Sequence, residues 1–239
     1  MDQQAMQTLA QWVQQSDNIV FFGGAGVSTE SNIPDFRSAD GLYNQHYNVP
    51  PETMLSHHYF VQHPEEFFRF YREKMICLSA RPNPAHLKLA QWEREGKLRA
   101  GITQNIDGLH QMAGSKRVIE LHGSVHRNIC QRCGKVYDAQ WIMQTQGVPH
   151  CSCGGMVKPD VVLYEEALNG QDIEDAVAAI EQADVLIVGG TSLAVYPAAG
   201  LIRYYRGHKL ALINRDPTPY DQQADVRLNG NIGQIMQQL

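Results

Sequence analysis

The sequence contains few charged residues, and its charge balance is slightly acidic. Charged residues make up 19% of the 239 positions, and twenty lysines and arginines against twenty-five aspartates and glutamates give a net charge of -5. An acidic balance argues against nucleic acid or an anionic membrane surface as the main partner, because both carry negative charge. We therefore expect no nucleic acid and no membrane among the partners.

An unbroken apolar run of membrane-spanning character is also missing. Residues 185–202 carry no charge over eighteen positions, which reaches the minimum length of a spanning helix. Gly189, Gly190 and Pro197 divide this stretch, so that it reads as a buried strand, a loop and the start of a helix. The segment predicts part of an α/β domain and no transmembrane helix.

The amino-terminal segment lacks the features of a signal peptide. Residues 1–15 have neither a basic start nor an apolar core, and Leu9 and Val13 stand at helical spacing. We expect a helix here and a cytoplasmic protein. With 43% hydrophobic residues and no internal repeat, the chain is expected to form one globular unit over residues 1–239, as a monomer.

Strand-like and helix-like patterns alternate along most of the chain. The clearest strand patterns lie at 19–22, 99–103, 185–188 and 209–213, and the clearest helical patterns at 84–95 and 171–182. Alternation of this kind predicts an α/β fold with a Rossmann-like, doubly wound parallel sheet. Its nucleotide-binding lobe is expected to comprise residues 1–42, 80–124 and 158–239.

Two segments interrupt this alternation and are interpreted as insertions. One is residues 43–79, rich in aromatic residues and helix formers, and the other is residues 125–157, with four of the five cysteines. We expect a helical insertion and a zinc-ribbon insertion that together form a smaller lobe. Small-molecule sites favour boundaries of this kind, so the cleft between the lobes is the expected binding site.

The cysteines of the second insertion have metal-binding spacing. They form the pattern C-x2-C-x17-C-x-C, with the four ligands Cys130, Cys133, Cys151 and Cys153. Four thiolates in one segment suit a structural, tetrahedral zinc ion, although two disulfides and a redox C-x-x-C pair are the competing interpretations. His126 and His150 flank the cluster as possible substitute ligands. The fifth cysteine, Cys77, is predicted to be a buried packing residue.

A glycine-rich turn follows the first predicted strand. Gly24, Ala25 and Gly26 stand where a backbone turn can approach phosphates, and free N–H groups at the start of the next helix favour negative charge. The pattern suits a dinucleotide. It is weak on its own, because glycine pairs end many buried strands for packing reasons.

Polar residues gather after two further predicted strands. Gln104, Asn105 and Asp107 follow one strand and His122 follows the next. Open α/β sheets bind ligands at the carboxyl ends of their strands, so these are candidate site residues. Asn105 and Asp107 could equally cap a helix, and a lone histidine is more often structural, so local sequence alone favours the structural interpretation.

The order of these motifs along the chain resembles the sirtuin family. The similar stretches are Gly24–Arg37, Thr103–His110, Glu120–Gly123, the cysteine segment, Lys158–Glu166, Gly190–Ala198 and Ile213–Asn214, and the resemblance spans nearly all of residues 19–235. Asn32 and Glu165 stand where the family usually has glycine, and the second cysteine pair is C-x-C where C-x2-C is usual. Asparagine tolerates a positive φ, so we expect Asn32 to preserve the turn.

The resemblance implies a bacterial NAD-dependent protein deacetylase. In sirtuins the acyl oxygen of an acyl-lysine attacks the ribose carbon that nicotinamide leaves, and a histidine then deprotonates a ribose hydroxyl. The implied products are nicotinamide, O-acyl-ADP-ribose and free lysine. His122 matches that histidine, and the implied catalytic residues are His122, Asn105 and Asp107. A neutral imidazole near pH 7 suits the role of general base.

The resemblance also implies two contact sets. The expected NAD-binding residues are Gly24, Ala25, Gly26, Thr29, Asp35, Phe36, Arg37, Gln104, Asn105, Ile106, Asp107, His122, Gly190, Thr191, Ser192, Asn214 and Ile232. The expected contacts of an extended acyl-lysine peptide or protein substrate are Val161, Leu163, Tyr164, Leu193 and Val195. One structural zinc ion completes the expected cofactors.

Two other functions use the same fold. A protein mono-ADP-ribosyltransferase would share the NAD site, and a non-catalytic NAD or ADP-ribose sensor would only bind there. The presence of His122 favours deacylation. An acetyl or other uncharged acyl group is expected, because Tyr71 and Arg72 are adjacent and would point to different helix faces, unlike the Tyr-x-x-Arg pair of succinyl-preferring relatives.

Overall fold

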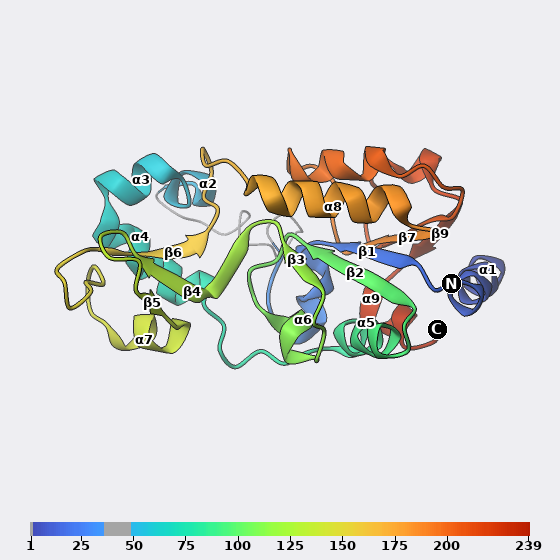
Figure 1. Ribbon diagram of the computed structural model, residues 1–239, viewed down its shortest axis with the longest axis horizontal. Coiled ribbons are helices and arrows are strands. Elements are labelled where there is room, and N and C mark those ends of the chain that lie inside the picture. The colour runs from blue at the N-terminus through green and yellow to red at the C-terminus, as the bar shows by residue number, and fades with distance from the viewer. Residues whose placement is uncertain (1, 36–48) are drawn as a thin grey trace.

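The computed structural model describes residues 2–35 and 49–239 (Figure 1). Two of the expected NAD-binding residues, Phe36 and Arg37, lie outside these ranges. The larger part of the molecule contains a parallel sheet between helices, and the smaller part lies beyond the carboxyl ends of strands β1 and β2 of that sheet (Figure 1).

The parallel sheet has the predicted doubly wound arrangement. Within the described residues it contains six strands in the order β3-β2-β1-β7-β8-β9. These are β1 (Ile19–Gly23), β2 (Leu98–Thr103), β3 (Val118–Glu120), β7 (Val185–Gly189), β8 (Leu210–Asn214) and β9 (Val226–Asn229). All neighbours pair in parallel, and the strand order reverses between β1 and β7. Open α/β sheets bind their ligands at such a reversal.

The central strands are apolar on both faces, because helices cover both sides. All five residues of β1 are buried, and its alternate side chains enter different cores, with Phe21 in one and Phe22 in the other. The covering helices are α1 (Gln3–Gln15), α5 (Pro84–Arg94) and α9 (Ile232–Met236) for the first core, and α8 (Gly170–Gln182) with the 3-10 segment Ala198–Tyr204 for the second. Successive strand residues point to opposite faces, which is why one strand contributes to both cores.

Helices α1, α5 and α8 confirm the helices predicted from the sequence in residues 1–15, 84–95 and 171–182. Asp2 caps α1 by accepting hydrogen bonds from the amides of Gln4 and Ala5, and Leu9 and Val13 are buried. Asn83 caps α5, with Pro84 in the first turn. None of the helices in the described part of the chain is long and apolar enough to span a bilayer.

The smaller part is built around an antiparallel sheet in the order β5-β4-β6. Its elements are β4 (Gly123–Cys130), β5 (Val136–Tyr137), β6 (Val157–Val161), α7 (Ala139–Gln144), α2 (Pro51–Met54), α3 (His57–Gln62) and α4 (Pro64–Phe70). One core unites the two interrupting segments, because aromatic residues of α4 pack with Val125 and Val157. The sheet begins two residues before the predicted insertion at 125 and continues four residues past its end at 157.

Two local expectations need correction or addition. Cys77 was expected to be buried and is exposed: the π-helical segment Tyr71–Met75 ends at Ile76, and Ile76 is the buried residue. Strand β9 was not predicted, since four residues with Arg227 and Asn229 exposed offer little apolar pattern. The short helix α6 (Leu109–Met112) follows the Asp107 loop.

Candidate active site

A cavity of about 570 Å³ opens at the reversal of strand order. Its walls come from the loops after β1, β2, β7 and β8, and from the loop after β6 in the smaller part. The loops after β1 and β7 contact each other directly: the amide of Gly24 donates to the carbonyl of Gly189, and the amide of Gly26 donates to that of Gly190 over 2.7 Å. The cavity therefore lies at the position expected for a nucleotide.

Glycine is required at two positions of this contact. A Cβ on Gly26 would lie 2.9 Å from the Cα of Gly190, and a Cβ on Gly190 would lie 2.3 Å from the nitrogen of Val27. Gly190 also has a φ of +59°, in the left-handed region. The backbones of the loops after β1 and β7 thus approach each other closely, and the absence of side chains at Gly26 and Gly190 leaves room for a ligand in the cavity.

A serine that was not among the predicted site residues connects the first loop to the second. Ser28 donates a hydrogen bond to Asp107 Oδ2 over 2.6 Å and accepts one from Asn105 Nδ2 over 3.1 Å. Asp107 Oδ1 accepts from the amide of Leu109, at the start of α6. Asp107 is not the N-cap of α6, which is Gly108, although one of its carboxylate oxygens accepts from the first amide of the helix while the other belongs to the site.

His122 has a defined tautomer. Its Nδ1 lies 2.9 Å from the carbonyl oxygen of Gln104, which can only accept, so Nδ1 carries the proton and Nε2 is the basic nitrogen. Burial lowers the pKa of His122 below its ordinary value, and the hydrogen bond to Gln104 partly opposes that effect. Gln104 is held in turn by Thr191, whose hydroxyl lies 3.1 Å from Gln104 Nε2.

Most of the sequence-predicted residues lie together around this cavity. Those that line it are Ala25, Gly26, Thr29, Asp35, Gln104, Asn105, Ile106, Asp107, His122, Val161, Leu163, Tyr164, Gly190, Thr191, Ser192, Val195, Asn214 and Ile232. Of the predicted residues that the structure describes, two do not line it. Gly24 lies behind the turn against Thr191, and the side chain of Leu193 is 1% exposed and packs in the core.

The two departures from the glycine pattern both have positive φ. Asn32 has a φ of 62° and ends a short 3-10 turn, which confirms the prediction that it preserves the turn. Glu165 has a φ of 75° and lies on the cavity wall. A positive φ is unfavourable for any residue with a Cβ. Contacts made by the Glu165 side chain are therefore needed to offset the cost of this backbone conformation.

The four clustered cysteines form a candidate zinc centre. Their sulfur atoms lie within 4.8 Å of one another, with 3.5 Å between Cys130 and Cys153 and 3.6 Å between Cys133 and Cys151. These separations are too long for disulfides and match the sulfur–sulfur edge of about 3.8 Å that Zn–S bonds of about 2.3 Å give in a tetrahedron. The thiolate set therefore fits one structural zinc ion.

The unusual C-x-C pair closes its turn with glycine. Gly154 has a φ of 82°, and its amide donates to the carbonyl of Cys151, while Gly134 has a φ of 73° and does the same to Cys130. The hydroxyl of Tyr137 lies 3.1 Å from the sulfur of Cys151. The shorter spacing is thus accommodated in the backbone, and all four sulfurs still converge.

A parallel sheet with a cavity at its reversal, a buried histidine in that cavity and an adjoining four-cysteine centre define a nucleotide-binding protein with a zinc ribbon. The Sir2 family profile matches residues 24–197, and the chain belongs to this family, the sirtuins. It is 59% identical over 229 residues to a protein of Clostridium acetobutylicum named NAD-dependent protein deacetylase, covering 94% of each chain.

Solved structures agree over nearly the whole length. A Sir2 variant with a deacetylated p53 peptide and 3'-O-acetyl ADP ribose is 38% identical, with a TM-score of 0.89, covering 98% of this chain and 96% of the other. A complex of Sir2 with p53 peptide and NAD+ is 39% identical, with a TM-score of 0.84, covering 97% and 95%. The similarity therefore includes both parts of the molecule.

Proposed function

We propose that this chain is an NAD-dependent protein lysine deacylase that releases nicotinamide and transfers the acyl group of an acyl-lysine to ADP-ribose. The observation that carries the proposal is the state of His122. A neutral imidazole with its proton on Nδ1 has a basic Nε2. The same cavity is lined by the glycine-rich loop after β1, which is suited to binding phosphates. The Clostridium acetobutylicum relative is named for the same co-substrate.

The chain's own residues divide the work of the reaction. Ala25 and Gly26 of the turn after β1 receive the phosphates of NAD, and Asn214, whose amide donates to the Thr191 carbonyl, borders the adenosine side. Asn105 and Asp107, held by Ser28, orient the nicotinamide ribose. His122 Nε2 accepts the proton of a ribose hydroxyl, and the Gln104 carbonyl stabilises the imidazolium through Nδ1–H.

The zinc ion has a structural role in this proposal. The four residues that would hold the ion are Cys130, Cys133, Cys151 and Cys153, and four thiolates would leave no ligand position for a substrate. When bound, the ion crosslinks the two turns that carry the cysteine pairs. The chemistry at the cavity does not involve it.

We propose an uncharged acyl group as the one removed, because neither Tyr71 nor Arg72 lines the cavity. The guanidinium of Arg72, the cation adjacent to Tyr71, donates to the Ile142 and Gly147 carbonyls and to the Thr145 hydroxyl. Tyr71 is buried, with its hydroxyl 3.5 Å from Asn128. Both side chains are engaged within the smaller part, which supports acetyl-lysine as the preferred substrate.

The test is nicotinamide release from NAD, followed by mass spectrometry, with acetyl, succinyl and longer acyl-lysine peptides. We expect release that requires an acetyl peptide, with O-acetyl-ADP-ribose as co-product, and loss of it in His122→Ala. NAD binding without deacylation would favour a sensor. Attachment of ADP-ribose to the protein substrate, without deacylation, would favour a transferase. A cytoplasmic location, a monomeric state and the absence of nucleic-acid and membrane partners stay predictions of the sequence.

A further inference from the structure

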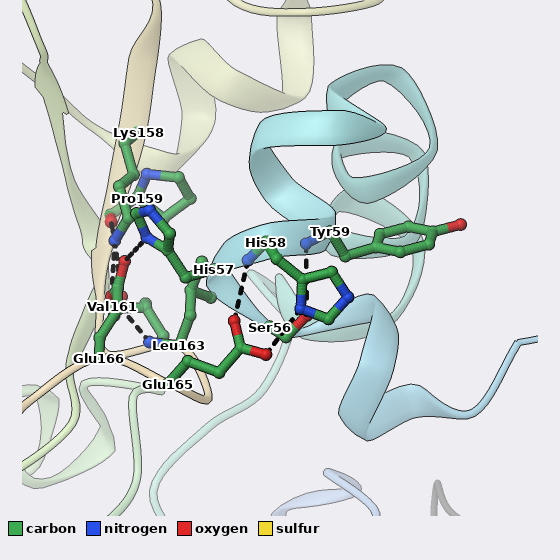
Figure 2. A network of polar contacts seen from close by, with 10 residues as sticks. All are labelled: Ser56, His57, His58, Tyr59, Lys158, Pro159, Val161, Leu163, Glu165 and Glu166. Carbon is green, nitrogen blue, oxygen red and sulfur yellow. Dashed lines mark hydrogen bonds and ion pairs between the residues drawn. The ribbon is translucent and has the colours of Figure 1, made fainter.

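Two adjacent glutamates after β6 reach two adjacent histidines at the start of α3 (Figure 2). Glu165 Oε1 lies 2.6 Å from His58 Nδ1, and Glu166 Oε1 lies 2.8 Å from His57 Nδ1. The partners are 107 and 109 residues apart in the sequence. We call the contacts between Glu165 and His58 the 58–165 clasp.

Glu165 uses both of its carboxylate oxygens in the clasp. Besides the ring contact, Oε2 accepts a hydrogen bond of 3.0 Å from the backbone amide of His58. These bonds, the backbone one first, lower the pKa of Glu165, so the group is a carboxylate at neutral pH. The side chain thus compensates for a backbone at φ 75°, where the family usually has glycine.

The neighbouring glutamate anchors the same loop to β6. Glu166 Oε2 accepts from the amide of Leu163 over 2.9 Å and from Lys158 Nζ over 3.1 Å. Lys158 also donates to the carbonyls of Pro159 and Val161. Glu166 therefore fixes the loop from within and also ties it to His57, whereas Glu165 ties it to His58.

The clasp closes a short backbone ladder between the two segments. The amide of Tyr164 donates to the Leu55 carbonyl, and the amide of His57 donates to the Tyr164 carbonyl, each over 3.0 Å. Ser56 and Tyr164 form a parallel bridge. Leu55, Tyr164 and Glu165 all line the cavity, on the wall formed by the proposed peptide-contacting residues.

We propose that Glu165 is a positioning residue, which acts through His58 to hold the Val161–Tyr164 wall in the place where the acyl-lysine peptide binds. This inference rests on the deacylase function proposed above. A glycine here would remove the contacts of Glu165 and leave the wall held by the backbone ladder and by the Glu166–His57 contact. In this chain the wall is held before the peptide arrives, which lowers the ordering cost of binding. The clasp itself contacts neither the phosphate turn nor the His122 side chain. The wall that it holds reaches His122 through the backbone alone, because the Val162 amide donates to the His122 carbonyl over 3.0 Å, so we expect the clasp to act mainly on peptide binding.

The experiment compares Glu165→Gly, Glu165→Gln and His58→Ala in steady-state deacetylation of one acetyl-lysine peptide. Glycine suits φ 75° and removes the clasp, so we expect Glu165→Gly to raise the peptide KM by about fivefold or more while kcat stays within about twofold. The KM for NAD stays unchanged. Glutamine can accept from the His58 amide and bond the ring, so Glu165→Gln returns the KM to within about twofold of the parent.

His58→Ala removes the ring contact but keeps the backbone amide as a donor to Glu165, so it should raise the peptide KM less than Glu165→Gly does. The double variant should be no worse than Glu165→Gly, because Glu165→Gly already removes both contacts. His63→Ala is the matched control. His63 follows the other end of α3 and contacts the ring of Tyr59, so its loss should leave the KM unchanged. An unchanged peptide KM in Glu165→Gly, or a fall in kcat instead, overturns the positioning role.

Hydrogen–deuterium exchange of the segment containing Tyr164 separates this inference from the proposed function. Glu165→Gly should speed exchange at the Tyr164 amide, and this readout needs no turnover. If the parent protein deacylates no peptide, the proposed function fails and the positioning inference falls with it, even where exchange speeds up. If the parent is active and Glu165→Gly leaves both exchange and KM unchanged, only the positioning inference is overturned.

Discussion

The pKa of His122 sets the pH range in which the proposed base can work. Burial lowers the pKa of this histidine from its ordinary value of 6.5, so the neutral form persists further into acid than it does in a free imidazole. We expect kcat/KM for an acetyl peptide to stay flat down to about pH 6.5 and to fall only below it. A pH–rate profile of the parent protein measures this limb, and His208→Gln, at an exposed histidine, serves as control. An acid limb centred above about 6.5 would contradict the assignment.

Ser28 is the residue that joins the proposed ribose-orienting pair. Its hydroxyl donates to Asp107 and accepts from Asn105, so Ser28→Ala leaves a carboxylate oxygen without its donor. A hydrogen bond to a charged group contributes about 1.5–3 kcal/mol, so kcat/KM for NAD should fall by roughly ten- to a hundredfold. Steady-state kinetics with NAD varied would measure the loss, and an unchanged value at unchanged zinc content and thermal stability would refute this role.

Residue-level predictions succeeded where chemistry alone decides the outcome. Asn32 was expected to keep a positive φ because asparagine tolerates that conformation, and the structure confirms this. The exposure of Cys77 was predicted wrongly, because the apolar residues around it in the sequence do not show which one turns inward. Ser28 was missed, since a serine after a glycine turn has no spacing signal for a partner 79 residues away.

At the scale of elements, the cysteine turns should depend on bound zinc. Cys133→Ser removes one thiolate from a set whose sulfurs lie within 4.8 Å of one another, and Cys77→Ser removes an exposed thiol outside that set. We expect about one zinc per chain in the parent and in Cys77→Ser, and loss of most of it in Cys133→Ser, with a lower Tm. Metal analysis and thermal unfolding measure both effects. Equal zinc content in the two variants would count against the four-cysteine site.

Secondary structure along the sheet was largely predictable. Strands buried on both faces are apolar throughout, and in the helices between them apolar residues recur every three to four positions. The predicted strand at 185–188 and helix at 171–182 correspond closely to β7 and α8. The 58–165 clasp was not predictable. His58 and Glu165 are polar residues without any repeating pattern, and only the tertiary fold brings them together.

At the scale of the whole molecule, two buried histidines couple folding to pH. His86 on α5 and His110 on α6 have ring centroids 4.8 Å apart, and neither Nε2 has a hydrogen-bond partner among the described residues. Burial, with the neighbouring His110 as a second cause, lowers the pKa of His86 to about 3. Burial also lowers the pKa of His110, against the opposing charge of Asp107. Both rings are therefore neutral in the folded protein at neutral pH.

The sign of the resulting pH dependence follows from proton uptake. The unfolded chain protonates these histidines near pH 6.5 while the folded chain does not, so the free energy of unfolding falls as pH drops below 6.5. For His86 alone, we expect the free energy of unfolding to be about 2 kcal/mol lower at about pH 5 than at neutral pH, because each pH unit below 6.5 lowers it by about 1.4 kcal/mol. Urea unfolding at about pH 7 and about pH 5 measures this difference.

His86→Gln should reduce the pH-dependent loss of stability, because glutamine can still accept from the Asn83 amide in the capping box and does not titrate. His208→Gln, at an exposed histidine, should leave the loss unchanged, and an equal effect of the two variants would contradict the role of the buried pair.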